Sequence, residues 1–330
     1  MYDFALAGNI IVDTIKYIPA YPNKLELTHI RNMHSQLGGL VCNVGCTLAQ
    51  LDPDAKLAII GRIGSDADGE LVEKILGSHK GMDLRYVQKS GRTSFTDVFT
   101  VESTGERTFF TYSGADGTLT PEDIPYEALR GTLLHIGYAL LLPAMDAYDA
   151  EYGTVLARTL AYARQHGIQT SVDIVSENSN RVPNIVCPAL KYADYLTVNE
   201  FEAGMITGIP LRNAEGTLLA ERLPVVCRRL KDMGVGRWVT VHMPETACGT
   251  DECGMYWECK SLDLPKGFIT SSVGAGDAFV AGLLYMAKRG AALPEALRAA
   301  NAVAASKLSK EGVQPLREVM KLYEKYPVRV

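Results

Sequence analysis

A glycine-rich turn followed by an acidic residue is the part of this sequence best suited to chemistry. The run Gly274-Ala275-Gly276-Asp277 opens an apolar helical pattern that ends before Gly290. Glycines let backbone N–H groups approach a ligand closely, and the first N–H groups of a helix are unpaired at the positive end of its dipole. Such a turn can hold a phosphoryl group, and Asp277 beside it can accept a proton from an attacking hydroxyl. On these residues alone, a tight strand-to-helix connection capped by Asp277 is the simpler interpretation.

Two further sites carry side chains suited to a ligand. Gly38 and Gly39 precede Asn43 at the start of a helical pattern, so N–H groups and an amide could meet a substrate hydroxyl. A turn before a core helix explains the same residues. Asn199 and Glu202 follow a strand pattern, and their oxygens suit Mg²⁺. A capping Asn with a first-turn Glu is an alternative that is compatible with metal binding.

The elements that must position these residues alternate between strands and helices. This alternation predicts a parallel sheet with helices on both faces and a ligand beyond the carboxyl ends of the strands. Two of the predicted helices cover 148–165 and 216–233. The predicted strands are Phe4–Ala7, Leu57–Ile60, Leu133–Ile136, Gln169–Asp173, Tyr195–Val198 and Trp238–Val241.

One part of the chain departs from this alternation. Thr93–Val101 and Arg107–Tyr112 read as a hairpin, and 17–36 is polar and irregular. We therefore expect one domain, 1–330, with a β-sheet lid formed by segments of about 14–36 and 93–113. Arg107 can bind an anionic group on a substrate or remain solvated on this hairpin.

Bulk composition excludes several classes of protein. The 330 residues are 47% hydrophobic and 22% charged, as in an ordinary globular enzyme, and the net charge of −5 without a basic patch argues against nucleic acid. No apolar stretch approaches the roughly 20 residues that span a bilayer. The start of the chain lacks a basic, apolar leader, and the seven cysteines form no C-x-x-C pair. We expect a cytoplasmic protein with reduced thiols, away from membranes.

The motifs together resemble those of the PfkB family of ribokinase-like carbohydrate kinases. They occur in the family's order over nearly the whole chain, up to about Gly312. Ser271 and Ser272 stand where the family has Asp and Thr. The matching residues are Gly8, Asn9 and Asp13; Gly38, Gly39 and Asn43; Gly61, Gly64, Asp66 and Gly69; Asn199 and Glu202; and Gly274–Asp277 with Ala281 and Gly282.

The resemblance implies a fold and a set of roles. The fold is a ribokinase-like three-layer α/β/α sandwich with a mostly parallel central sheet and a small β-sheet lid. Asp277 is the catalytic base, and Gly274, Ala275 and Gly276 form the anion hole. The implied substrate-binding residues are Asp13, Gly38, Gly39, Asn43 and Arg107.

The resemblance also implies ATP and Mg²⁺. Glu202 would hold Mg²⁺ through water, Asn199 would orient a phosphate or the metal's water, and Ser272 and Asn301 would contact ATP together with the glycine turn. Potassium is doubtful, because Ser271 lacks the family's carboxylate that helps to seat a monovalent cation. The family's glycine-containing segment after Trp238–Val241 is missing, which leaves open a donor other than ATP.

The expected function is transfer of the γ-phosphate of ATP to a hydroxyl of a sugar or sugar derivative, by a homodimer that pairs through the lid. Two alternatives remain at this point. One is a nucleoside kinase of the same family, since Asp13 suits the diol of either substrate. The other is a sugar or nucleotide sensor that has kept the fold but not the catalysis.

Overall fold

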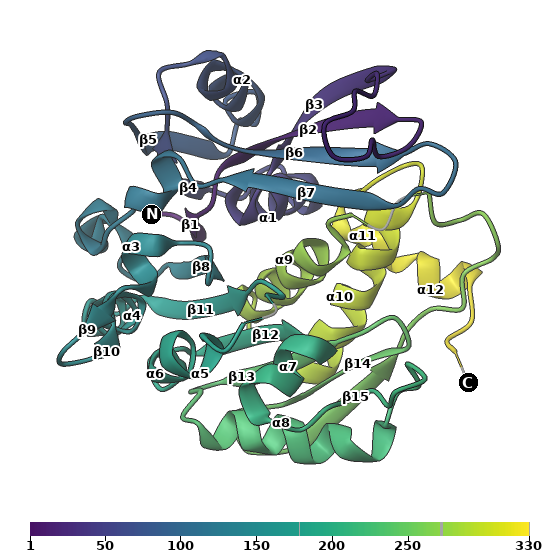
Figure 1. Cartoon of the computed structure of the whole chain (residues 1–330). Coiled ribbons are helices and arrows are strands. Elements are labelled where there is room, and N and C mark those ends of the chain that lie inside the picture. Colours follow the sequence, from purple (N-terminus) through teal and green to yellow (C-terminus); the bar gives the residue numbers. More distant parts are fainter. Residues whose placement is uncertain (178, 271–272, 330) are drawn as a thin grey trace.

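A nine-stranded sheet forms the centre of the molecule in the computed structural model, which describes residues 1–177, 179–270 and 273–329 (Figure 1). The strand order is β15-β14-β13-β12-β11-β8-β1-β4-β5. The seven strands from β13 to β5 are parallel, and β14 and β15 are added antiparallel at one edge. The strands are β1 (Phe4–Gly8), β4 (Leu57–Ile63), β5 (Met82–Lys89), β8 (Leu133–Ala139), β11 (Gln169–Ile174), β12 (Tyr195–Asn199), β13 (Trp238–His242), β14 (Thr246–Thr250) and β15 (Tyr256–Lys260).

Helices cover both faces of this sheet, so the three-layer α/β/α prediction is confirmed. The inner parallel strands are buried on both faces, as in β1, where all five residues are buried, whereas the edge strand β5 is partly exposed. One face carries α1 (Leu40–Leu51), α2 (Ala67–Leu76), α9 (Ala275–Lys288) and α10 (Leu293–Leu308). The other carries α3 (Pro143–Asp146), α4 (Val155–Gln165), α5 (Val182–Ile185), α6 (Cys187–Leu190), α7 (Glu200–Thr207) and α8 (Leu223–Asp232). The short helices α11 (Leu316–Met320) and α12 (Leu322–Lys325) follow α10.

A four-stranded sheet projects from this core (Figure 1). Its order is β3-β2-β6-β7, with β2 and β6 parallel and the outer pairs antiparallel. The hairpin of β6 (Ser94–Val101) and β7 (Arg107–Tyr112) agrees with the prediction. The segment predicted as irregular contains strands at both ends, because β2 (Ile11–Ile18) continues along β6 and β3 (Asn32–Gly38) pairs back onto it.

Two predicted helices begin later than their apolar patterns suggested. α4 begins at Val155 because the Thr154 hydroxyl accepts the Ala157 N–H at 3.1 Å, and a two-stranded ribbon, β9 (Tyr148–Asp149) and β10 (Gly153–Thr154), precedes it. α8 begins at Leu223, because the residues after Gly216 form a turn and a 3₁₀ segment first. A side-chain cap thus decides where α4 begins, and the preceding turn and 3₁₀ segment decide where α8 begins.

Neither a membrane span nor a disulfide is part of this fold as far as the structure describes it. Across 1–177, 179–270 and 273–329, no helix has the length and apolar content to cross a bilayer. All seven cysteines are free thiols.

Candidate active site

A cavity of about 330 Å³ lies where several parallel strands end against the start of α9. Tyr138, at the end of β8, Asp173 on β11, Asn199 on β12 and His242 on β13 all line it, facing the glycine turn. This is the carboxyl edge of the sheet, where the strand–helix alternation predicted a ligand.

Asp277 is fixed in this cavity by two hydrogen bonds. The Tyr138 hydroxyl donates to Oδ1 at 2.6 Å, and the Asn43 amide donates to Oδ2 at 2.9 Å. Burial raises the pKa of Asp277, and these two donors lower it by stabilising the ionised form. Burial also raises the pKa of Tyr138, which therefore remains a neutral donor. A carboxylate with one orientation and stabilised charge is well suited to accept a proton.

The start of α9 presents backbone donors next to this carboxylate. Gly274 caps the helix in the left-handed region at φ 76°, and the first backbone bond of the helix is Ala278 N–H to Gly274. In the portion of the chain that the structure describes, the N–H groups of Ala275, Gly276 and Asp277 have no acceptor. A Cβ on Gly276 would approach His242 Cε1 to 3.3 Å, so the close packing of the turn favours glycine there. These free donors at a helix N-terminus can bind an oxyanion.

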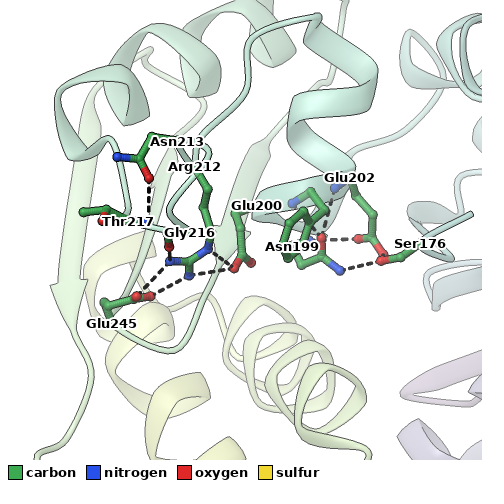
Figure 2. A network of polar contacts seen from close by, with 10 residues as sticks. Ser176, Asn199, Glu200, Glu202, Arg212, Asn213, Gly216, Thr217 and Glu245 are labelled. Atoms are coloured by element: carbon green, nitrogen blue, oxygen red, sulfur yellow. Dashed lines mark hydrogen bonds and ion pairs between the residues drawn. The ribbon is translucent and has the colours of Figure 1, made fainter. Parts of the chain in front are cut away.

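Asn199 and Glu202 form a capping box at the start of α7 (Figure 2). Asn199 Oδ1 accepts the Phe201 and Glu202 N–H groups, and Glu202 Oε2 accepts the Asn199 N–H at 2.8 Å. Ser176 completes the network by donating to Glu202 Oε1 at 2.8 Å and accepting from the Asn199 amide at 2.9 Å. Burial raises the pKa of Glu202 to about 7. The capping interpretation is therefore correct, and it leaves both side chains on the wall of the cavity.

The cavity also has the donor set of a magnesium site. Asp173 lies on the same wall as Glu202, and among the described residues its buried Oδ1 has no hydrogen-bond partner. Burial raises the pKa of Asp173 well above its ordinary range, and the Asp277 charge raises it further. A nearby cation would relieve both effects. Two carboxylates fit Mg²⁺, which binds through one or two carboxylates plus phosphates and keeps several waters. No group of three or more metal-binding side chains occurs within the described ranges.

The predicted acceptor-binding residues meet at the base of the lid. A Cβ on Gly38 would come within 2.3 Å of Asp13 Oδ2, and a Cβ on Gly39 within 2.5 Å of the Asn9 carbonyl. Only glycine lets β3 pass this closely, and Gly39 then caps α1, the helix that carries Asn43. Burial raises the pKa of Asp13 to about 6. Gly38 thus contacts Asp13, and Asn43, whose N–H bonds to the Gly39 carbonyl, connects this region to Asp277.

Arg107 lies away from this region. On the lid, Asp13 pairs with Thr96 and Thr96 with Thr111, whereas Arg107 pairs with Thr100. Arg107 is therefore four residues further out along β7, about 13 Å from the row of Asp13. Its side chain is exposed and has no hydrogen-bond or ion-pair partner in the described parts of the chain. The strand register of the lid therefore keeps Arg107 away from the site.

A second cavity, of about 460 Å³, lies on the other side of the glycine turn. Its walls are mainly apolar, with Phe279 on α9 and Leu264 and Ile269 before the turn, and Asn301 on α10 contributes a polar edge. The Asn301 amide donates to the Cys259 carbonyl at 3.0 Å, so part of its capacity is already used. A flat apolar slot of this kind suits a nucleotide base. Ser272, predicted to contact ATP, and Ser271 lie outside the described residues.

An ion-pair cluster, not a glycine loop, holds the turn between β13 and β14 beside this second cavity (Figure 2). The Met243 N–H bonds to the Thr246 carbonyl at 3.1 Å, which makes the turn tight. Arg212 forms two hydrogen bonds to Glu200 and two to Glu245, all between 2.8 and 3.0 Å. The cluster connects this turn to the first residue of α7. The position of the turn, which the absence of the family's glycine segment left unpredicted, is therefore held by ion pairs.

The sequence interpretation missed Tyr138 and Asp173. Asp173 ends a predicted strand, so its position at the carboxyl edge was a usable signal. Tyr138 had no such signal, because nothing in the local pattern relates it to a residue 139 positions away.

An α/β sandwich with a carboxylate beside a free helix N-terminus, next to a nucleotide-sized slot, defines the class of small-molecule phosphotransferases. The chain belongs to the pfkB family of carbohydrate kinases, since that family's model matches residues 5–319. The resemblance inferred from the motifs is thereby confirmed, and with it the expected class of enzyme, a phosphotransferase with an alcohol group as acceptor.

Individual relatives are distant. A deoxyribokinase from Salmonella typhi is 24% identical over 335 residues, covering 98% of both chains. A ribokinase from Staphylococcus aureus (strain COL) is 22% identical over 213 residues, and the match spans only 64% of that relative. The structure of Arabidopsis thaliana ribokinase, complexed with ribose and ATP, superposes with a TM-score of 0.77 at 21% identity, covering 98% of this chain and 99% of that one. At this identity the superposition establishes the fold.

Proposed function

We propose that this protein transfers the γ-phosphate of Mg-ATP to a hydroxyl of a sugar or sugar derivative. The observation that carries the proposal is the Asp277 carboxylate, buried and hydrogen-bonded at the mouth of a turn whose N–H groups have no acceptor among the described residues. Family membership and relatives named as ribokinases, deoxyribokinases and fructokinases support a sugar-like acceptor.

The acceptor would bind between the lid and α1. Asp13 would receive two of its hydroxyls, while Gly38, Gly39 and Asn43 form the adjoining wall. The reacting hydroxyl would reach Asp277, and Asp277 would accept its proton as the new O–P bond forms. Arg107 could join only if the lid closes. Such closure would exclude water from the reaction.

The phosphoryl donor would lie across the glycine turn. Its base would occupy the apolar slot beside Asn301, and the N–H groups of Ala275, Gly276 and Asp277 would receive the charge of the moving phosphoryl group. Asp173 and Glu202 would hold the waters of Mg²⁺, with Asn199 beside them, and the metal would offset charge on the donor phosphates. Monovalent-cation dependence is not expected to be strong, because Ser271 replaces the family's Asp.

The exposed aromatic residues of the lid support the proposal that the protein is a homodimer. Strand register places Phe95, Phe99, Phe110 and Tyr112 on the face opposite Asp13, where Phe110 is 56% and Tyr112 47% exposed. An exposed aromatic face of this kind favours burial against a second copy. Sedimentation equilibrium should give the mass of two chains.

We also propose that the chain is a single kinase domain located in the cytoplasm.

The test is ADP release from Mg-ATP over a panel of sugars, sugar phosphates, sugar acids and nucleosides, with Asp277→Asn in parallel. We expect turnover with a sugar class and a loss of about 10³-fold or more in the variant, since a general base contributes on that order. Turnover of nucleosides alone would support the nucleoside kinase instead. ATP binding without turnover of any acceptor would favour the sensor, and an active Asp277→Asn would remove Asp277 as base.

A further inference from the structure

A lysine at the end of α10 approaches the glycine turn from outside the known motifs. A Cβ built on Gly274 would lie 3.1 Å from Lys307 Cε and 4.0 Å from its Nζ, so the ammonium lies against the turn itself. The left-handed backbone at Gly274 leaves that approach open. A side chain at 274 would occupy the space that the lysine uses.

The packing of α9 against α10 fixes this placement. The two helices are antiparallel neighbours, and Gly282 on α9 allows contact so close that a Cβ there would be 2.9 Å from Ala300 Cα. The C-terminal end of α10 therefore lies beside the N-terminal end of α9. The segment before the turn is also tied to α10, because the Thr270 N–H and hydroxyl both donate to the Leu308 carbonyl, at 2.9 and 3.2 Å.

The described residues offer the Lys307 ammonium no polar partner. In the described ranges it has no ion pair or hydrogen-bond acceptor, although its side chain is only partly exposed. Burial raises the pKa of Asp277 and that of Cys46 on α1, and the positive charge of Lys307 opposes both shifts. The ammonium thus lies beside the glycine turn, near the base and α1. A cation without a partner among the described residues is available to an anionic ligand.

We propose that Lys307 is a further catalytic residue, whose ammonium contacts the transferring phosphoryl group and supplies the fixed positive charge of the glycine turn. This inference rests on the proposed phosphoryl transfer. The chain thereby carries its own cation at the place where negative charge develops, in addition to the backbone N–H groups. Such charge acts most strongly on the transition state, because charge builds up there on the moving group.

Lys307→Met keeps the length of the side chain and removes its charge. We expect kcat to fall about 100-fold, with the affinity for ADP changed by less than about threefold. Lys307→Arg should retain part of the activity. Lys310→Met is the matched control, since Lys310 is an exposed lysine three residues on that does not contact the turn. It should stay within about twofold of wild type.

Two further measurements separate charge from folding and from the proposed function. In Lys307→Ala, added ethylammonium should restore turnover, whereas ethanol should not. Equal rescue by both compounds, or rescue by neither, would contradict a catalytic role for the Lys307 charge. The second compares binding of a non-hydrolysable ATP analogue with binding of ADP, which needs no acceptor. Wild type should favour the triphosphate, and Lys307→Met should lose that preference by about tenfold. If wild type phosphorylates nothing, the proposed function fails while this binding test still decides on Lys307. Unchanged preference and unchanged kcat in Lys307→Met would reject the proposal.

Discussion

At the scale of single residues, the site depends on how Asp277 is held. Its two oxygens accept hydrogen bonds from two different elements, the Tyr138 hydroxyl on β8 and the Asn43 amide on α1. Burial opposes ionisation of this carboxyl, and the two donors favour it. The pKa of the proposed base is therefore influenced by two residues that do not themselves accept the proton.

Tyr138→Phe tests this adjustment. Loss of the hydroxyl removes a bond to the charged form, so the pKa of Asp277 should rise and the acid limb of kcat/KM should move to higher pH by about one unit or more. The pH profile of kcat/KM measures this shift. Tyr148→Phe, an exposed tyrosine, is the control and should leave the profile unchanged. An acid limb that stays in place would mean that Tyr138 does not tune the base.

At the scale of elements, the Arg212 cluster joins three segments that are distant in sequence. Glu200 begins α7, Glu245 lies in the β13–β14 turn, and Arg212 bonds to both carboxylates. The Glu200 side chain is only 7% exposed, whereas that of Glu245 is 40% exposed. The ion pair with the buried Glu200 should therefore contribute more to the free energy of unfolding than the pair with Glu245.

Arg212→Leu should lower the free energy of unfolding by about 3 kcal/mol, because it leaves the Glu200 charge buried without its partner. It should also raise KM for ATP, since the loosened turn borders the nucleotide slot. Urea unfolding and ATP titration measure the two effects. Glu245→Gln should cost much less, and Arg228→Leu, at an exposed arginine on α8, should be close to neutral. Equal losses for Arg212→Leu and Arg228→Leu would exclude a specific role for the cluster.

These elements also show how far the sequence could predict the molecule. Most of the six strands recognised in advance are mainly apolar, and nearly all of their residues are buried. β15 was missed because it is partly exposed and carries polar residues such as Glu258 and Lys260, and β14 because its sequence has no apolar run although it is buried. The glycine turn, Asp13 and Asn199 were found because their spacing is local. Tyr138, Arg212 and Lys307 were missed because only the folded chain brings them to the site, whereas Asp173 was missed although it ends a predicted strand.

At the scale of the whole molecule, buried carboxyl groups link stability to pH. Asp116 is 1% exposed, and both of its oxygens accept the Ile10 N–H, at 3.2 and 3.1 Å. Burial raises the pKa of Asp116 to about 7, and raises those of Asp13 and Asp146 to about 6. The folded state then binds protons that the unfolded state has released, so stability decreases as pH rises from about 4 to about 7.

Asp116→Asn should remove the contribution of Asp116 to the pH dependence of the free energy of unfolding. The group contributes a slope of about 1.4 kcal/mol per pH unit between its unfolded and folded pKa values. Urea unfolding at pH 5, 6 and 7 should therefore show a shallower decline in the variant, while the remaining carboxyls keep some slope. Parallel curves for wild type and variant would mean that Asp116 is already ionised in the folded protein.

The hydrogen bonding of Asp277 has a consequence for wasted ATP. Each carboxylate oxygen accepts one hydrogen bond, from Tyr138 or from Asn43, so each can accept one more donor. A water molecule could therefore reach the carboxylate, but no further contacts would hold it in line for attack. A polyol would be held by Asp13 and by the start of α1 through hydroxyls remote from the reacting atom. Those remote contacts, and not the base alone, would thus direct the phosphoryl group to the acceptor instead of to water.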